Sequence, residues 1–339
     1  MTEKTPQELL EEFYSKPLYL SYSALNKLIY APVLYYNHYV LKQKEDKLDS
    51  YLIDGKLIHC LLLDNGSFDQ QFILMPDTLP TDSARTVIDK VYILHREKCK
   101  IYLDFTTSEL TVYTEEILNI LKEINLHQSL KTDQQRLDKI ITEQAKSYFE
   151  FLKIKKDKTL VDSETIKRCN DSVTVLKTNS KVSNLLGLFV SEMDNVDIKN
   201  EQEFKAELDK SFGLKGIIDS LKLDHDSKII YINDLKTTGK SLIDFPETVE
   251  FYNYWAQAAI YQRLVWYNFN DLIFNQGYKV LFNFIVVDKY LQVYPFAVSD
   301  DTMSKWQLKL ENLFNEANWH YSNKNYNLPF KFATGNVIL

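Results

Sequence analysis

Four side chains near the middle of the chain have the types that bind a divalent cation and act on a phosphate group: Glu207, Asp219, Asp234 and Lys236. Alternate side chains of a strand share a face, so Asp234 and Lys236 are expected to point the same way, roughly 6–7 Å apart. Leu235 would point to the opposite face and leave its backbone carbonyl available as a ligand. Acidic groups on neighbouring strands beside a lysine would form an oxygen-rich metal site next to a fixed positive charge.

The positions of the two aspartates carry more weight than the Asp-x-Lys triplet, which arises easily by chance. Asp234 follows an apolar run at an expected strand end, and Asp219 follows Gly216 and two isoleucines. Burying two unpaired carboxylates is costly, and a shared cation would remove that cost. For Glu207 two interpretations remain open: a metal-binding or water-positioning role, and a surface ion pair with Lys205 or Lys215.

The strands expected to carry these groups are short runs rich in β-branched and apolar residues. Polar turn clusters at 209–213 and 224–228 separate them, which is typical of a three-stranded antiparallel meander. The three runs are Phe204–Leu208, Leu214–Leu223 and Ile229–Thr238.

Two helices add polar side chains to this list. His59 lies in an apolar helical stretch, four residues after Gly55, and is by default a core histidine. As a ligand it would favour manganese over magnesium, which prefers oxygen. Asn253, Gln257 and Tyr261 follow at four-residue spacing on one face of a strong helix, as the polar edge of a core helix or as a functional edge.

The order of elements predicts a mixed α/β fold. Helical patterns dominate up to residue 186. The meander, a helix, two strand-like runs (278–287 and 291–298) and a last amphipathic helix follow. We expect a central mixed sheet flanked by helices, with a large helical N-terminal extension. Residues 1–186 would form the mostly helical part that contributes His59, and residues 187–339 the core, in one continuous structural unit.

Composition bounds the function less sharply. The net charge of −7 argues against a protein coated in nucleic acid, but it is compatible with one local basic groove. Three widely separated cysteines argue against a disulfide framework, a zinc ribbon and a four-cysteine iron–sulfur cluster. The sequence has no long apolar run and no apolar signal core. It therefore predicts no membrane span and no export, and we expect a cytoplasmic protein.

Taken in order, the motifs resemble the PD-(D/E)XK nuclease superfamily, in particular its RecB-like branch and, within it, the exonuclease domain of RecE. The resemblance covers roughly residues 18–300, but it does not extend to the helical stretch 84–160. A proline that often precedes the first motif aspartate is Ile218 here. The motifs are Gly55-x-x-x-His59, Gly216-Ile-Ile-Asp219, Asp234-Leu-Lys236 and Gln257-x-x-x-Tyr261.

The resemblance implies a restriction-endonuclease-like fold and roles for individual residues. Asp219 and Asp234 would bind the metal, with the Leu235 carbonyl and His59 as further ligands. Lys236 would orient the attacking water and offset the developing charge. The motif residues Gln257 and Tyr261 would hold the substrate strand or brace the site.

The activity that the resemblance implies is hydrolysis of DNA phosphodiester bonds with one or two Mg²⁺ or Mn²⁺ ions. A 5′→3′ double-strand DNA exonuclease of recombination or phage DNA metabolism is the expected form. A catalytically inactive nuclease-fold DNA-binding or assembly module and an endonuclease of the same fold remain alternatives. DNA is the expected partner, with a single-strand annealing protein and a homo-oligomer as further expectations.

Overall fold

The computed structural model describes residues 4–43, 50–76, 78–101, 107–155, 158–191, 195–208, 212–335 and 337. Their contacts divide the chain into two compact units. One combines Met1–Asn65 with Asn170–Leu339, and the other is Gly66–Cys169. The expected boundary at residue 186 therefore differs from the division by contacts, which groups the first 65 residues with the sheet. Each unit is described by itself.

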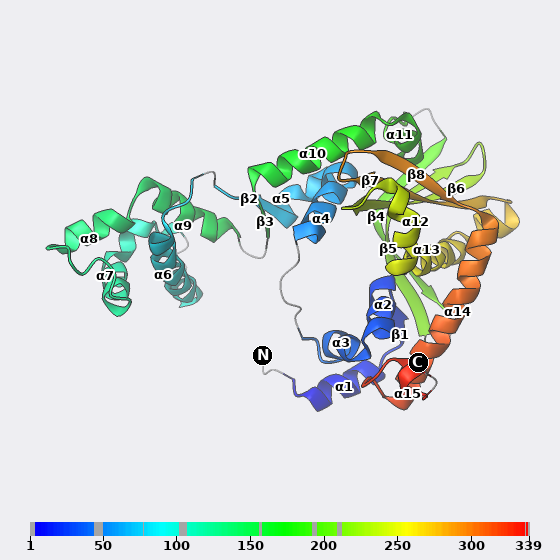
Figure 1. Cartoon of the computed structure of the whole chain (residues 1–339), viewed down its shortest axis with the longest axis horizontal. Coiled ribbons are helices and arrows are strands. Elements are labelled where there is room, and N and C mark those ends of the chain that lie inside the picture. The colour runs from blue at the N-terminus through cyan, green and yellow to red at the C-terminus, as the bar shows by residue number, and fades with distance from the viewer. Residues whose placement is uncertain are drawn as a thin grey trace. The chain divides into compact units, whose positions relative to one another are not determined.

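The first unit contains the sheet and the helices that cover it (Figure 1). Its strands are β1 (Leu18–Leu20), β4 (Val196–Glu207), β5 (Phe212–Asp224), β6 (Ile229–Thr238), β7 (Lys279–Asp288) and β8 (Val293–Val298). Its longer helices are α1 (Pro6–Tyr14), α2 (Tyr22–Tyr30), α4 (Ser50–Leu63), α13 (Tyr254–Asn268) and α14 (Asp300–Asn323), with α10 (Ser163–Thr178) leading into it. Its shorter helices and turns are α3 (Pro32–Tyr35), η1 (Tyr36–Val40), α11 (Ser180–Leu186), η5 (Leu242–Asp244), α12 (Phe245–Phe251), η6 (Asp271–Asn275) and α15 (Phe330–Ala333).

The expected meander is confirmed. β4 pairs antiparallel with β5, and β5 pairs antiparallel with β6. β7 then runs parallel to β6, and β8 pairs antiparallel with β7, so the sheet is mixed. The first strand is longer than expected, because it begins at Val196 rather than Phe204. Residues 209–211 of the expected first turn lie outside the described part of the chain.

One edge of β5 is shared by two strands. β4 pairs along the opposite edge, while β1 pairs with Phe212–Leu214 and β6 pairs with Ser220–Asp224. In the described chain, neither β1 nor β6 pairs with residues 215–219 on the shared edge. Asp219 is the last residue of this gap, at the point where β6 separates from β5. A gap of this kind leaves room between two strands for side chains and a ligand.

Helices cover both faces of the sheet, and the main hydrophobic core lies between the sheet and α13, α14 and α2. On the other face, Asn233 of β6 donates a hydrogen bond to the Leu185 carbonyl of α11. α4 approaches β6 near Thr237, which shares that face because alternate side chains of a strand lie together. The site is therefore bordered by helices that come from distant parts of the sequence.

The strong helix expected to carry Asn253, Gln257 and Tyr261 is interrupted. α12 ends at Phe251, and α13 begins at Tyr254, because Asn253 adopts a left-handed backbone with φ 57°. The prediction that Asn253 shares a helical face with Gln257 and Tyr261 is therefore wrong. Asn253 instead donates a hydrogen bond to Asn26 at 2.8 Å and so joins this turn to α2.

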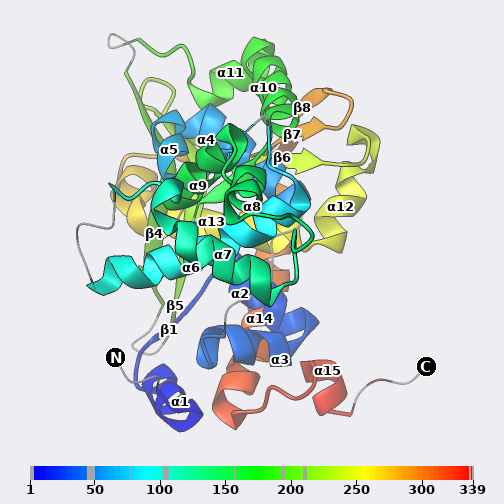
Figure 2. The same ribbon diagram turned by 90° about the vertical axis from the view of Figure 1, so that its left-hand side faces the viewer.

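The second unit has a small hydrophobic core of its own, formed by side chains of α6, α7, α8 and α9, and these four helices lie together in both views (Figures 1 and 2). A short parallel strand pair, β2 (Phe72–Leu74) and β3 (Thr159–Val161), joins the two ends of the unit. Its helices and turns are η2 (Asn65–Ser67), α5 (Phe68–Gln71), α6 (Asp82–Ile101), η4 (Leu110–Tyr113), α7 (Thr114–Glu123), α8 (Asp133–Ile140) and α9 (Glu143–Lys155).

Within the described chain, the helices lack the length and apolar content needed to cross a bilayer.

Candidate metal centre

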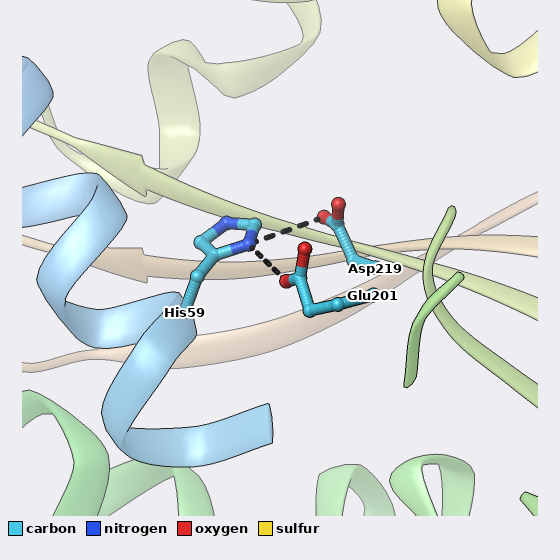
Figure 3. A group of neighbouring side chains, drawn as sticks. All are labelled: His59, Glu201 and Asp219. Atoms are coloured by element: carbon cyan, nitrogen blue, oxygen red, sulfur yellow. Dashed lines mark hydrogen bonds and ion pairs between the residues drawn. The ribbon is translucent and has the colours of Figure 1, made fainter. Parts of the chain in front are cut away.

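Three side chains from three elements form the centre of the site: His59 of α4, Glu201 of β4 and Asp219 of β5 (Figure 3). Their ligand atoms lie within 4.8 Å of one another. His59 Nδ1 is 3.1 Å from Glu201 Oε1 and 3.8 Å from Asp219 Oδ2. One nitrogen and two carboxylate oxygens at this separation form a donor set that a divalent cation can occupy after small shifts of the side chains.

The carbonyl of Leu235 joins this group. His59 Nε2 lies 3.0 Å from Leu235 O, so both ring nitrogens face hydrogen-bond acceptors. Burial alone would lower the pKa of His59, but the charges of Asp219 and Glu201 outweigh it and raise the pKa to about 9. A protonated ring therefore balances the carboxylates in the metal-free protein. The oxygens that surround this positive ring are hard ligands of the kind that a bound cation needs.

Asp219 is oriented from the neighbouring strand. Its Oδ2 accepts a hydrogen bond of 2.8 Å from the backbone N–H of Leu235. That N–H lies beyond the last residue pair of the β5–β6 ladder, Ser220 with Asn233. The Asp219 carboxylate therefore takes the place of a backbone acceptor from the neighbouring strand. Burial raises the pKa of Asp219, against the opposing charges of His59 and Lys236. A raised carboxyl pKa marks a position where a bound cation would restore the charged form.

Asp234 and Lys236 form a buried ion pair next to this group. Lys236 Nζ contacts Asp234 Oδ2, and the Asp234 side chain is fully buried. Among the described residues, none donates a hydrogen bond to Asp234 Oδ1. Burial, together with the charge of Asp219, raises the pKa of Asp234 to about 6 even though Lys236 opposes the shift. An orphaned buried carboxylate oxygen beside a ligand cluster fits a metal-binding role, since such atoms otherwise find partners.

The ammonium of Lys236 is stabilised from two directions. Burial would lower its pKa, but Asp234 and Asp219 raise it above the usual value, so the lysine stays charged. Its Nζ also lies 4.8 Å from the ring centroid of Tyr254 on α13, a cation–π contact. This second contact holds the charge beside the carboxylates without using one of their oxygens.

Gln257 and Tyr261 form the edge of the site on α13. Gln257 Nε2 donates a hydrogen bond of 2.9 Å to Tyr261 Oη, and both side chains are buried. Burial and the negative charges of Asp219 and Asp234 raise the pKa of Tyr261 well above its ordinary value. Tyr261 therefore remains a neutral phenol, able to donate a proton in a hydrogen bond.

A glycine explains how close α13 comes to β5. A Cβ on Gly216 would lie 2.9 Å from the Tyr261 ring, so the tyrosine can cross β5 only above a glycine. A Cβ on Gly55 would lie 3.4 Å from Thr237 Oγ1, at the place where α4 approaches β6. Gly216 thus allows α13 to pack against β5, whereas at Gly55 an added Cβ would make only an ordinary contact.

Glu207 does not lie with the other predicted site residues. It is at the end of β4, opposite Gly213, and accepts a hydrogen bond of 3.2 Å from the Tyr19 hydroxyl at the surface. The carboxylate of β4 that reaches the site is Glu201, roughly 20 Å away along the strand. The sequence did not single out Glu201. The β4–β5 register could have identified it, because the residue pairs before and after Glu201 set it opposite Asp219.

The centre keeps an open side. The side chains of His59 and Glu201 retain 24% and 30% of their exposed surface, while Asp234 has none. A ligand could therefore approach past His59 and Glu201, with Asp234 and Lys236 at the inner wall. Catalytic metal sites differ from structural ones in keeping such an open position.

No family model and no curated protein matches this sequence. Among solved structures, one similar chain is the crystal structure of a "putative exonuclease" from Eubacterium rectale. The two chains are 12% identical, with a TM-score of 0.45, and the alignment covers 100% of this chain and 88% of that chain. A likeness at this level says nothing of the chemistry, so the functional conclusions rest on the side chains of the site.

Proposed function

We propose that this protein is a metal-dependent nuclease that hydrolyses DNA phosphodiester bonds. The observation that carries the proposal is the convergence of His59, Glu201, Asp219 and the Leu235 carbonyl beside the buried Asp234–Lys236 pair. A nitrogen and several hard oxygens fit Mn²⁺ or Mg²⁺, with the imidazole favouring Mn²⁺. A fixed ammonium next to such a group fits a reaction in which negative charge increases on a phosphoryl group.

The residues of the chain have separate tasks in this proposal. A bound divalent cation would supply Lewis-acid activation of the phosphate and of an attacking water. Asp219, Asp234, Glu201 and His59 would hold that cation, together with the Leu235 carbonyl. Lys236, fixed by Asp234 and the Tyr254 ring, orients the water and offsets charge on the phosphoryl oxygens.

Gln257 and Tyr261, at the edge of the site on α13, would bind the substrate strand. The neutral Tyr261 hydroxyl can donate to a phosphate oxygen, and Gln257 fixes its orientation. In the described chain, the buried Gln257 Oε1 has no hydrogen-bond donor, so it can accept one more hydrogen bond. These two residues would brace the strand at the scissile phosphate.

The finer form of the proposal is a 5′→3′ double-strand DNA exonuclease of the RecE type, active in recombination or phage DNA metabolism. The support for this form is the resemblance of the four motifs in their order. A single-strand annealing protein as partner and a homo-oligomeric assembly belong to the same proposal.

Incubation with linear and with covalently closed circular duplex DNA in Mg²⁺ and in Mn²⁺ tests it. Loss of linear DNA alone, in a reaction stopped by EDTA, is the expected result. Loss of both substrates would identify an endonuclease instead. If neither substrate is cut under any metal condition, the chain is a binding or assembly module and the nuclease proposal fails. Duplexes labelled at one 5′ or one 3′ end then give the polarity.

A further inference from the structure

A row of aromatic rings leads from the site to the surface. Lys236 Nζ lies over the Tyr254 ring, and Tyr254 in turn stacks on Tyr252, with ring centroids 5.6 Å apart and planes at 26°. The Phe251 ring then meets Tyr252 edge-on, with centroids 4.9 Å apart. Tyr252 and Phe251 are 46% and 75% exposed, so the outer end of the row lies in solvent.

The backbone that carries these exposed rings is tied down. The Tyr22 hydroxyl of α2 donates a hydrogen bond of 2.6 Å to the Tyr252 carbonyl. The next residue, Asn253, has a left-handed backbone and bonds to Asn26 of α2 and to the Trp255 indole. The interruption between α12 and α13 thus presents two aromatic side chains to solvent on a rigid turn.

A fixed, solvent-facing aromatic ring beside a phosphate-binding site is suited to one kind of ligand. Bases of a single strand stack on such rings with little sequence preference, because every base has a π-face. An ordered ring also costs less entropy on binding than a mobile side chain. The exposed aromatic rings of this turn are therefore suited to stack a nucleobase next to the reacting groups.

We infer that Tyr252 is a stacking platform for the nucleobase next to the phosphate held at Lys236, with Phe251 bracing the ring from its edge. This inference rests on the proposed nuclease function and adds a substrate-positioning residue to it. The platform would hold the reacting strand as an unpaired strand, whatever its sequence.

The first test is kinetic and uses short linear duplexes whose reacting strand extends as a single-stranded overhang. Tyr252→Ala should lower kcat/KM about tenfold, mainly through KM, since one base–aromatic stack is lost. Tyr252→Phe keeps the ring and should restore wild-type kinetics, whereas Tyr252→Leu should behave as Tyr252→Ala does. Phe274→Ala is the matched control, because Phe274 is 72% exposed but lies before β7, at the end of the sheet away from Lys236.

An abasic nucleotide separates stacking from a structural role. The abasic nucleotide is placed at each position of the oligonucleotide in turn. At one of these positions it should lower the wild-type kcat/KM by the same factor as Tyr252→Ala does. At that position it should cause no further loss in the variant. Equal sensitivity of wild type and Tyr252→Ala to the abasic site would overturn the inference.

A binding measurement makes this failure distinguishable from failure of the proposed function. Quenching of 2-aminopurine, placed near the oligonucleotide end, should occur with Lys236→Ala protein and be lost in the Lys236→Ala/Tyr252→Ala protein. If wild type cuts DNA but this quenching does not depend on Tyr252, only the stacking inference fails. If wild type cuts no DNA yet quenching depends on Tyr252, the platform stands and the nuclease proposal fails.

Discussion

Lys236 is the residue on which the chemistry depends most. Its ammonium is held by Asp234 and Asp219, whose charges outweigh burial, and by the Tyr254 ring. It is therefore a permanent positive charge in a dry position, where one charge stabilises a transition state far more than it would in water. Its ammonium contacts Asp234 but is not itself a metal ligand, so its removal should affect chemistry more than binding.

Lys236→Ala should reduce the cleavage rate by at least about 100-fold, the loss typical of one preorganised stabilising group. Mn²⁺ and DNA affinity should stay close to the wild-type values. Single-turnover cleavage, calorimetry with Mn²⁺ and fluorescence binding of DNA measure the three quantities. Undiminished turnover in the purified variant would remove Lys236 from the mechanism.

Glu201 and Glu207 form a natural matched pair on the same strand. Glu201 lies 3.1 Å from His59 at the centre, while Glu207 bonds to Tyr19 at the surface. Glu201→Gln should weaken Mn²⁺ binding about 10–100-fold, as the loss of a ligand or of its close partner typically does. Glu207→Gln should bind Mn²⁺ as wild type does.

Titration calorimetry of the two variants decides between these acids. Equal Mn²⁺ affinity in Glu201→Gln and wild type, or a loss confined to Glu207→Gln, would show that Glu201 is not part of the metal site. Asp219→Asn is the positive reference, because it keeps an oxygen acceptor for the Leu235 N–H but removes a charged ligand.

Asp234 makes the stability of the metal-free protein depend on pH, and its raised pKa gives the sign of this dependence. Its pKa is about 6 in the folded chain and about 4 when unfolded, so the folded state binds more protons between these values. Stability contributed by the protonated form is therefore lost as pH rises through about 6. Asp234→Asn lacks this titration.

Thermal unfolding in EDTA at pH 4.5 and pH 7.5 measures the effect. Relative to Asp234→Asn, wild type should lose stability on the order of 1–3 kcal/mol between the two pH values. A constant difference between the two proteins across this range would mean that Asp234 does not titrate as its burial implies.

At the scale of elements, the site depends on a gap in the sheet and on helices that come close to it. β6 separates from β5 after Asn233, and Asp219 occupies the gap. α13 reaches β5 above Gly216, and α4 reaches β6 at Gly55. The motif that contains Gly216 thus reflects close packing as much as chemistry.

Gly216→Ala tests this packing. The added methyl group would meet the Tyr261 ring at 2.9 Å and the Leu264 side chain at 3.1 Å, in a buried interface. The cost of overpacking, about 1–3 kcal/mol, should exceed the smaller gain from reduced unfolded-state freedom. Denaturant unfolding should therefore show a less stable protein, and cleavage should fall because Tyr261 shifts.

Gly66→Ala is the control for that substitution, because among the described residues beyond its chain neighbours none comes within 4 Å of its added Cβ. Its stability should stay within about 1 kcal/mol of wild type. If Gly216→Ala is as stable and as active as Gly66→Ala, the close approach of α13 does not constrain the site.

At the scale of the whole molecule, the strand pattern could be predicted well, because apolar runs mark the strands and polar clusters mark the turns between them. The mixed sheet, the meander and the helical content all appear in the structure. The interruption at Asn253 could not be predicted, since its left-handed backbone is stabilised by contacts with the distant α2. The same holds for the compact unit of residues 66–169, whose separation depends on which helices share a core.

The site itself could be predicted only in part. His59, Asp219, Asp234, Leu235 and Lys236 were expected from their motifs, and these residues lie together. Glu201 was missed because the expected strand began at Phe204, which left Glu207 as the acid on β4. The register between strands, rather than the residue types, decides which of several acids faces Asp219.

The proposed mechanism requires one divalent cation bound by His59, Glu201, Asp219, Asp234 and the Leu235 carbonyl. Anomalous X-ray scattering from a crystal of the wild-type protein soaked in Mn²⁺ tests it most directly. We expect a peak at about 2.0–2.4 Å from the ligand atoms of this group, absent in Asp219→Asn crystals. A fully occupied manganese peak elsewhere, or none at this group in saturating Mn²⁺, would show that these residues do not form the metal site.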